Sequence, residues 1–192
     1  MARTKAFDRD EALSRAIGLF AQHGYEGTST PALLEAMGIG RQSLYDTFGD
    51  KWRLYLEALR RYSSDSVGAQ LLVLESARDG AAGVEALLLR AAAVASAEAH
   101  PACLGVSAIC EFGRSAPEIV DLNDALGRML TGAIERRVRE AVAAGRFGAD
   151  LDPAAAAGFV LATLTGIKVA ARMGADAGAL EGIARMALRG FR

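Results

Sequence analysis

Two short segments separated by a glycine turn place the tightest limit on the fold of this chain. Pro31 favours a helix start close to Thr30. Proline is tolerated in the first helical turn, because the N–H that it lacks would have no hydrogen-bond partner within the helix there. That helix is expected to run to Met37, where Gly38 breaks it, and a third helix is expected to follow through about Phe48. A pair of short helices around a tight turn is the helix-turn-helix layout, whose second helix enters the major groove of DNA.

The apolar residues favour helices along the rest of the chain as well. Hydrophobic residues make up 52% of the sequence, but Ala and Leu dominate them and only 6% of the residues are aromatic. Ala and Leu are strong helix formers, whereas strands favour β-branched and aromatic residues. We therefore predict an all-α protein.

Helical periodicity and capping residues predict nine helices. Asp8 and Glu11 have the spacing of a capping box for the first helix, which is expected to stop near Gly24. Beyond residue 50, longer helices are expected at about 51–76, 82–100, 103–113, 117–145, 153–173 and 176–191. The predicted organisation is a three-helix helix-turn-helix domain at 1–50 and a six-helix ligand-binding and dimerisation domain at 51–192.

The charge of the chain does not by itself indicate nucleic-acid binding. The net charge is −1. Residues 1–62 carry 9 Lys and Arg against 8 Asp and Glu, hence +1, and residues 63–192 carry 13 against 15, hence −2. Any contact with DNA must therefore come from a locally arranged basic surface.

The second helix of the pair has two distinct sides. At about 100° per residue, Leu44 and Phe48 point into the core. The other positions carry Arg41, Gln42, Ser43, Tyr45 and Asp46. Arg and Gln can contact guanine and adenine edges, and Ser and Tyr suit phosphates, whereas the charge of Asp46 repels phosphates unless it faces a cytosine amino group. These residues alone leave open a helical subdomain with a solvated polar face.

Residues 8–60 resemble the N-terminal domain of the tetracycline-repressor (TetR) family. The matching stretches are Ala16–Phe20, Gly24–Ser29, Glu35–Ile39, Ser43–Tyr45 and Phe48–Lys51. The resemblance implies base and phosphate contacts by Arg41, Gln42, Ser43 and Tyr45, and phosphate contacts by Thr28 and Lys51. The chain departs from the family at Gly40, where a Ser or Thr cap is common, and at Leu34, where a small Ala is common.

The resemblance also implies a pocket for a small-molecule effector among the middle helices. The candidate residues are Tyr62, His100, Cys103, Cys110, Phe112, Asn123, Met129 and Thr163. His100 and the two cysteines form the one cluster of soft ligands, but a transition-metal site generally needs three or four ligands and the sequence has no further cysteine. We therefore expect neither a metal nor another cofactor. Thiol-based redox sensing through Cys103 remains an alternative to a structural role for that residue.

The last two predicted helices are candidates for a dimer surface. Their apolar stripes contain Phe159, Leu164, Ala171, Leu180, Ile183 and Leu188. An internal hairpin packed on its own subunit would use the same residues. The resemblance favours a four-helix bundle between two subunits, and a two-fold homodimer is how a helix-turn-helix protein reads a palindromic site.

The sequence thus predicts a ligand-responsive regulator, namely a repressor that a small apolar effector releases from a palindromic double-stranded DNA operator. An enzyme is not expected, because the chain lacks a nucleophile elbow, a phosphate loop, a metal-ligating histidine pair and a dinucleotide fingerprint. A helical protein-interaction module without DNA binding is a further alternative. We also expect a cytoplasmic protein without a membrane partner, since no signal peptide and no charge-free run of 18 apolar residues is evident.

Overall fold

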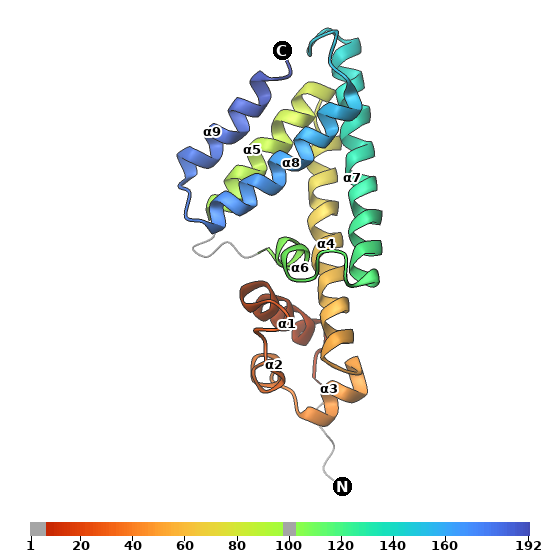
Figure 1. Cartoon of the computed structure of the whole chain (residues 1–192), viewed down its shortest axis with the longest axis vertical. Helices are drawn as coiled ribbons and strands as arrows, with labels where there is room; N and C mark the ends of the chain where they lie inside the picture. Colours follow the sequence, from red (N-terminus) through yellow and green to blue (C-terminus); the bar gives the residue numbers. More distant parts are fainter. Residues whose placement is uncertain (1–6, 98–102) are drawn as a thin grey trace. The chain divides into compact units, whose positions relative to one another are not determined.

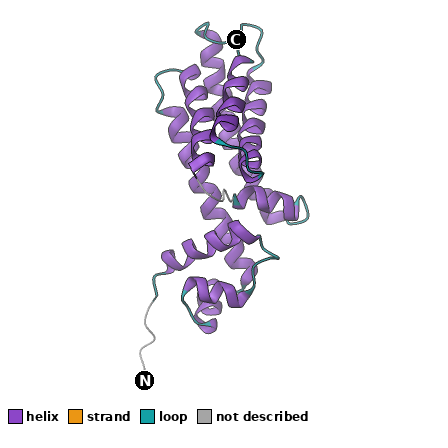
Figure 2. Cartoon of the chain, turned by 90° about the vertical axis from the view of Figure 1, so that its left-hand side faces the viewer, coloured by secondary structure: helices purple, strands orange, loops and turns teal. Residues whose placement is uncertain are grey.

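The structure is a computed structural model that describes residues 7–97 and 103–192. Within these two ranges the chain forms nine α-helices and no strand (Figure 2). The predicted all-α class is therefore confirmed.

The first three helices begin and end at the residues that capping chemistry favours. They are α1 (Arg9–His23), α2 (Thr30–Met37) and α3 (Arg41–Phe48). The Asp8 carboxylate caps α1 by accepting hydrogen bonds from the N–H groups of Asp10 and Glu11. Ser29 caps α2 in the same way, and Gly38 ends α2 with a φ of 69°, a left-handed conformation that glycine adopts at little cost.

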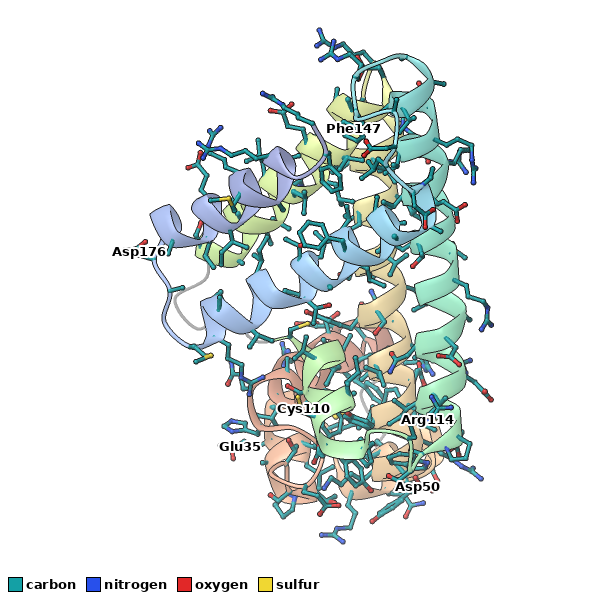
Figure 3. The ribbon with its side chains drawn as sticks, turned by 45° about the horizontal axis from the view of Figure 1, so that its top comes forward. Glu35, Asp50, Cys110, Arg114, Phe147 and Asp176 are labelled. Atoms are coloured by element: carbon teal, nitrogen blue, oxygen red, sulfur yellow. The ribbon has the colours of Figure 1, made fainter. Side chains whose placement is uncertain are left out.

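Six longer helices follow, with bounds close to those expected. They are α4 (Lys51–Glu75), α5 (Gly80–Ala97), α6 (Leu104–Phe112), α7 (Pro117–Ala143), α8 (Pro153–Arg172) and α9 (Ala177–Arg189). Helix α5 begins two residues earlier than predicted, because Asp79 accepts a hydrogen bond from the Ala82 N–H at its N-terminus. Asp176 caps α9 at the bend that follows α8 (Figure 3).

The helices pack as two compact units. The N-terminal unit contains residues 7–64 and Cys103–Leu122, and the C-terminal unit contains residues 65–97 and Asn123–Arg192. Helices α4 and α7 contribute to both units. This division differs from the predicted boundary at residue 50, because α6 packs with the N-terminal helices rather than with α5, α8 and α9.

The N-terminal unit combines an apolar core with ion pairs between helices. Each of its first four helices buries large apolar side chains, among them Leu13, Phe20, Leu33, Leu44 and Leu54. Two ion pairs join α1 to α4: Arg9 lies 2.7 Å from Glu57, and Arg61 lies 3.0 Å from Asp10. Because these pairs are exposed, each of them contributes little to stability.

The C-terminal unit is built mainly from aliphatic packing. Helix α5 packs against both α8 and α9, as Figure 1 shows. Its N-terminal end approaches α7 so closely that a Cβ at Gly80 would lie 2.0 Å from the carbonyl oxygen of Arg137. The Arg137 side chain is itself buried and donates hydrogen bonds to Ala77 O and to the Glu140 carboxylate. A glycine at position 80 is therefore a packing requirement.

Two of the described helices, α5 and α8, are long and apolar enough to cross a membrane by length and composition. Both carry charged residues, Glu85 and Arg90 in α5 and Lys168 in α8. Both also supply buried side chains to the core of the C-terminal unit, including Leu88 and Leu164. Core helices commonly have this composition.

Candidate nucleic-acid interface

Helix α3 is held in place by its apolar side. Leu44 is fully buried and Phe48 is nearly so. The Arg9 guanidinium lies 5.0 Å from the centre of the Phe48 ring, where the negative face of the ring attracts a cation. These contacts fix the rotation of α3 about its axis and so determine which residues it exposes.

The opposite side of α3 is polar and open to solvent. Arg41, Gln42, Tyr45 and Asp46 are exposed, and Ser43 is half-buried. The Gln42 amide nitrogen donates a hydrogen bond of 2.8 Å to the Asp46 carboxylate one turn further along the helix. At the start of α3, Gly40 provides no side-chain cap, so the first N–H groups of the helix have no capping side chain. The helical periodicity thus predicted the exposure of Arg41, Gln42, Tyr45 and Asp46 correctly, whereas Ser43 is less exposed than expected.

The two remaining predicted DNA contacts flank α3 in the sequence. Lys51 is half-buried, and its amino group lies 4.1 Å from the centre of the Tyr25 ring. Thr28 is only 1% exposed, and its hydroxyl donates a hydrogen bond of 2.6 Å to the carbonyl of Gly24. The prediction of a phosphate contact by the Thr28 side chain is therefore wrong for this conformation, since that side chain stabilises the turn between α1 and α2.

An aromatic cluster lies behind the turn between α1 and α2. It consists of Phe20, Tyr25, Trp52, Tyr55 and Phe112, which come from α1, the turn, α4 and α6, and neighbouring rings lie 5.0–5.9 Å apart between centroids. Phe112 was predicted to line a ligand pocket, but it packs edge-on against Trp52 and at a tilt against Tyr25 and Tyr55. The Tyr55 hydroxyl is buried and has no hydrogen-bond partner among the described residues, and burial raises the pKa of Tyr55 well above its usual value.

Glu111 joins α6 to the same turn through hydrogen bonds. Its two carboxylate oxygens accept hydrogen bonds from the backbone N–H groups of Tyr25, at 2.9 Å, and Glu26, at 2.7 Å. Gly24 has a φ of 72°, and a Cβ there would approach the Glu111 carboxylate to 2.9 Å. Sequence reasoning missed this residue, because no spacing rule connects positions 86 residues apart.

The predicted effector residues are divided between the two units. Tyr62, Cys103 and Cys110 belong to the N-terminal unit, whereas Asn123, Met129 and Thr163 belong to the C-terminal unit. His100 lies outside the described residues. Met129 is 57% exposed, and the Thr163 hydroxyl donates to the Phe159 carbonyl within its own helix. Both cysteines are free thiols, and the described residues contain no group of three or more potential metal ligands.

The predicted dimer surface needs a correction. Leu164, Ala171 and Leu180 are buried inside their own chain, because they fill the core that α8 and α9 share with α5. Leu188 is half-buried, and Phe159 and Ile183 remain exposed.

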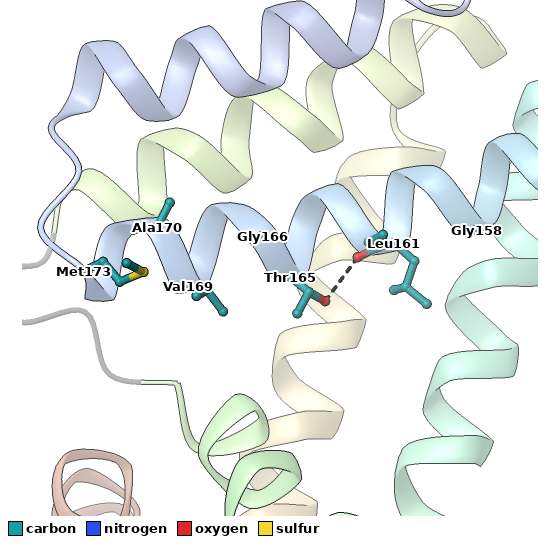
Figure 4. Close-up of a pocket in the computed structure, with 8 residues that line it drawn as sticks. Gly158, Leu161, Thr165, Gly166, Val169, Ala170 and Met173 are labelled. Carbon is teal, nitrogen blue, oxygen red and sulfur yellow. Dashed lines mark hydrogen bonds between the residues drawn. The ribbon is translucent and has the colours of Figure 1, made fainter.

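Other apolar residues extend the exposed surface along α8 and α9. A shallow apolar depression follows one side of α8, lined by Gly158, Leu161, Ala162, Thr165, Gly166, Val169, Ala170 and Met173 (Figure 4). Sequence periodicity located the helices correctly but assigned half of the dimer residues to the wrong side.

Comparison with known proteins shows the family. Residues 12–58 match the model of bacterial regulatory proteins of the tetR family, and residues 80–187 match the model of the tetracyclin repressor-like C-terminal domain. The second match alone covers more than half of the chain. The chain belongs to the TetR family. The resemblance inferred from the N-terminal residues is thus confirmed and extends to the C-terminal helices.

Individual relatives are transcriptional regulators. An uncharacterized HTH-type regulator, YezE of Bacillus subtilis (strain 168), is 47% identical over 76 residues, which are 40% of this chain and 39% of YezE. The HTH-type transcriptional repressor ComR of Escherichia coli (strain K12) is 50% identical over 60 residues, 31% of this chain and 29% of ComR. The matches therefore span less than half the length of these curated relatives.

One solved relative is similar over its full length. A cysteine mutant of the TetR family transcriptional regulator CifR, in complex with 26-bp double-strand operator DNA, is 34% identical, with a TM-score of 0.83 and complete coverage of both chains. Membership of this family makes the protein a transcriptional regulator. Its fold is that of CifR, a regulator whose structure was solved in complex with operator DNA.

Proposed function

We propose that this TetR-family regulator is a repressor that binds a palindromic operator as a homodimer and leaves it when a small apolar effector binds. The observation that carries the proposal is the polar, solvent-exposed side of α3, with Arg41, Gln42 and Tyr45, set on a buried apolar back. An exposed helix with this composition is suited to the major groove, where Arg and Gln read base edges. The complex of CifR with operator DNA supports the same reading.

Within this proposal, α3 supplies base contacts and its surroundings supply phosphate contacts. Arg41 and Gln42 stand at the N-terminal end of α3, the part of a recognition helix that reaches the bases. Tyr45, Ser43 and Lys51 would contact the backbone. Because the net charge of the chain is −1, binding depends on this local surface, and operator affinity should fall steeply with salt as phosphate contacts release counterions.

The exposed apolar side of α8 and α9 is where we place the second subunit. Phe159, Val169, Met173, Ile183 and Met186 are exposed there although all are large and apolar. The neighbouring glycines Gly158 and Gly166 have open space around them, so another helix could approach closely. A second copy is the occupant that the proposed palindromic operator requires, since a two-fold dimer matches a two-fold site.

Release by an effector requires a difference in affinity between two states. To change the populations from 99:1 to 1:99, the effector must favour one state by about 5.5 kcal/mol. We place the route to DNA in α6, because its residues Glu111 and Phe112 hold the turn before α2. A ligand that displaces α6 would alter the position of α2 and α3. Redox sensing through Cys103 is not part of this proposal. A disulfide between Cys103, the N-cap of α6, and Cys110 within α6 is disfavoured, because seven residues of helical rise place them about 10 Å apart.

Selection of operators from random double-stranded DNA tests the proposal. The expected product is one inverted repeat whose half-sites are centred about 34 Å apart or a multiple of that distance. A single asymmetric half-site would contradict the homodimer, and no enrichment of any sequence would contradict operator binding altogether, as for a protein-interaction module.

A substitution on α8 tests the dimer separately. Gly166→Glu places a charge in the exposed depression without a clash inside the subunit, since no described atom beyond the neighbouring backbone of α8 lies within 4 Å of a Cβ there. We expect a monomer by analytical ultracentrifugation, with unchanged helix content. Gly132→Glu on α7, also in open space, is the matched control and should remain dimeric. A dimeric Gly166→Glu variant would show that α8 does not form the interface.

A further inference from the structure

We propose that Asp46 is a positioning residue for base recognition, which orients the Gln42 amide so that α3 selects adenine. This inference rests on the proposed operator binding. It gives a role to a residue whose charge otherwise disfavours contact with DNA. It concerns the specificity of the regulator, which neither the family match nor the exposed polar side of α3 defines.

The geometry on α3 fixes the two side chains relative to each other. Gln42 and Asp46 are four residues apart, one helical turn, and both are exposed on the side opposite Leu44. The Gln42 Nε2 atom lies 2.8 Å from Asp46 Oδ1. Arg41 and Tyr45, the other exposed residues of this helix, belong to the same side, so the pair lies within the proposed reading surface.

The chemistry of this hydrogen bond allows one orientation of the amide. An ionised carboxylate only accepts hydrogen bonds, so it must face the amide nitrogen of Gln42 and not the amide oxygen. Without such a partner, the two ends of a glutamine amide can exchange places by rotation. With Asp46 in place, the carbonyl oxygen and the second N–H of Gln42 remain available for another partner.

One acceptor and one donor side by side match the major-groove edge of adenine. Adenine presents the N6 amino donor and the N7 acceptor, so it would donate to the Gln42 oxygen and accept from the remaining N–H. Guanine presents two acceptors, N7 and O6, and would need two N–H groups, one of which Asp46 already holds. The pair therefore favours an A·T pair over a G·C pair at one position of each half-site.

The same residue should lower the affinity for every sequence. A carboxylate on the reading side repels the phosphates of any duplex. Asp46 thus lowers the affinity for all sequences but increases the difference between them. A site without the A·T pair is repelled by the carboxylate and also lacks the match to Gln42. This combination predicts that removing Asp46 changes affinity and base preference in opposite directions.

Operator selection and binding measurements with four variants test the inference. Full-length wild-type protein, Asp46→Ala, Gln42→Ala and the double variant are compared on the wild-type operator and on operators with single A·T to G·C changes. We expect Asp46→Ala to reduce the preference for A·T at one half-site position by about 1.5-fold to twofold, the worth of an exposed pair of this kind on a helix. Affinity for other sequences should stay equal or increase.

A double-variant comparison separates positioning from direct contact. If Asp46 acts through Gln42, then Gln42→Ala removes the same preference, and adding Asp46→Ala changes the preference no further. Glu35→Gln, which removes an exposed charge from α2, is the control for charge alone and should leave every base preference unchanged.

Three results would overturn the inference. An unchanged A·T preference in Asp46→Ala would show that the carboxylate does not orient Gln42. If Asp46→Ala abolishes a preference for cytosine at another position, and does so in the Gln42→Ala background as well, Asp46 contacts a base itself. Wild-type protein that enriches no operator would refute the proposed function and this inference together, whereas normal wild-type binding with either of the first two results refutes the inference alone.

Discussion

The two units of this regulator are stabilised by different kinds of interaction. The N-terminal unit depends on specific geometry: an aromatic cluster, two carboxylate hydrogen bonds from Glu111, and ion pairs between α1 and α4. The C-terminal unit depends mainly on Ala, Leu, Val and Ile of α4, α5, α7, α8 and α9, with the ring of Phe191 beside them. Aliphatic cores tolerate exchange of one apolar residue for another, whereas directed contacts do not.

The largest expected effect concerns the core of the N-terminal unit. Phe20→Ala removes a fully buried ring of the aromatic cluster and should cost about 3–5 kcal/mol of stability. Hydrogen exchange followed by mass spectrometry should then increase in α1, α2 and α3 more than in α8 and α9. Leu88→Ala, in α5, is the matched change in the other unit and should produce the reverse pattern. Equal increases in both units for both variants would show that they unfold as one.

A second prediction concerns close packing in the C-terminal unit. Gly80→Ala should destabilise the protein by about 1–3 kcal/mol, because its Cβ would lie 2.0 Å from the backbone oxygen of Arg137. Gly132→Ala, in the open on α7, should instead stabilise it by about 0.4–1 kcal/mol through the entropy of the unfolded chain. Thermal unfolding measures both. A shift of the thermal unfolding midpoint in the same direction for both variants would contradict the close approach of α5 to α7.

The smallest of these effects tests the bond between α6 and the turn before α2. Glu111→Gln weakens two charge-assisted hydrogen bonds at an exposed position and should cost about 1 kcal/mol. Glu85→Gln, at an exposed position of α5, is the control and should change stability very little. Chemical denaturation measures the free energy of unfolding of both variants. Equal stability of the two variants would mean that Glu111 does not hold the turn.

The sequence predicted the helices and the exposed side of α3 because both follow from local rules. Caps at Asp8 and Ser29, the break at Gly38, and the burial of Leu44 and Phe48 depend on residues within one or two turns. Thr28 was misassigned because its burial results from a hydrogen bond within a folded turn, which the residue type does not reveal. Glu111 was missed, and Leu164 and Leu180 were misassigned, because contacts between distant helices decide their environment.

The central claim is that α3 reads DNA while the rest of the chain maintains the fold and the dimer. Its most direct test is the affinity of the double variant Arg41→Ala, Tyr45→Ala for the selected operator, measured by fluorescence anisotropy beside analytical ultracentrifugation. We predict a loss on the order of 100-fold in affinity, with the dimer and the helix content unchanged. Operator binding at wild-type affinity in this variant would contradict the account.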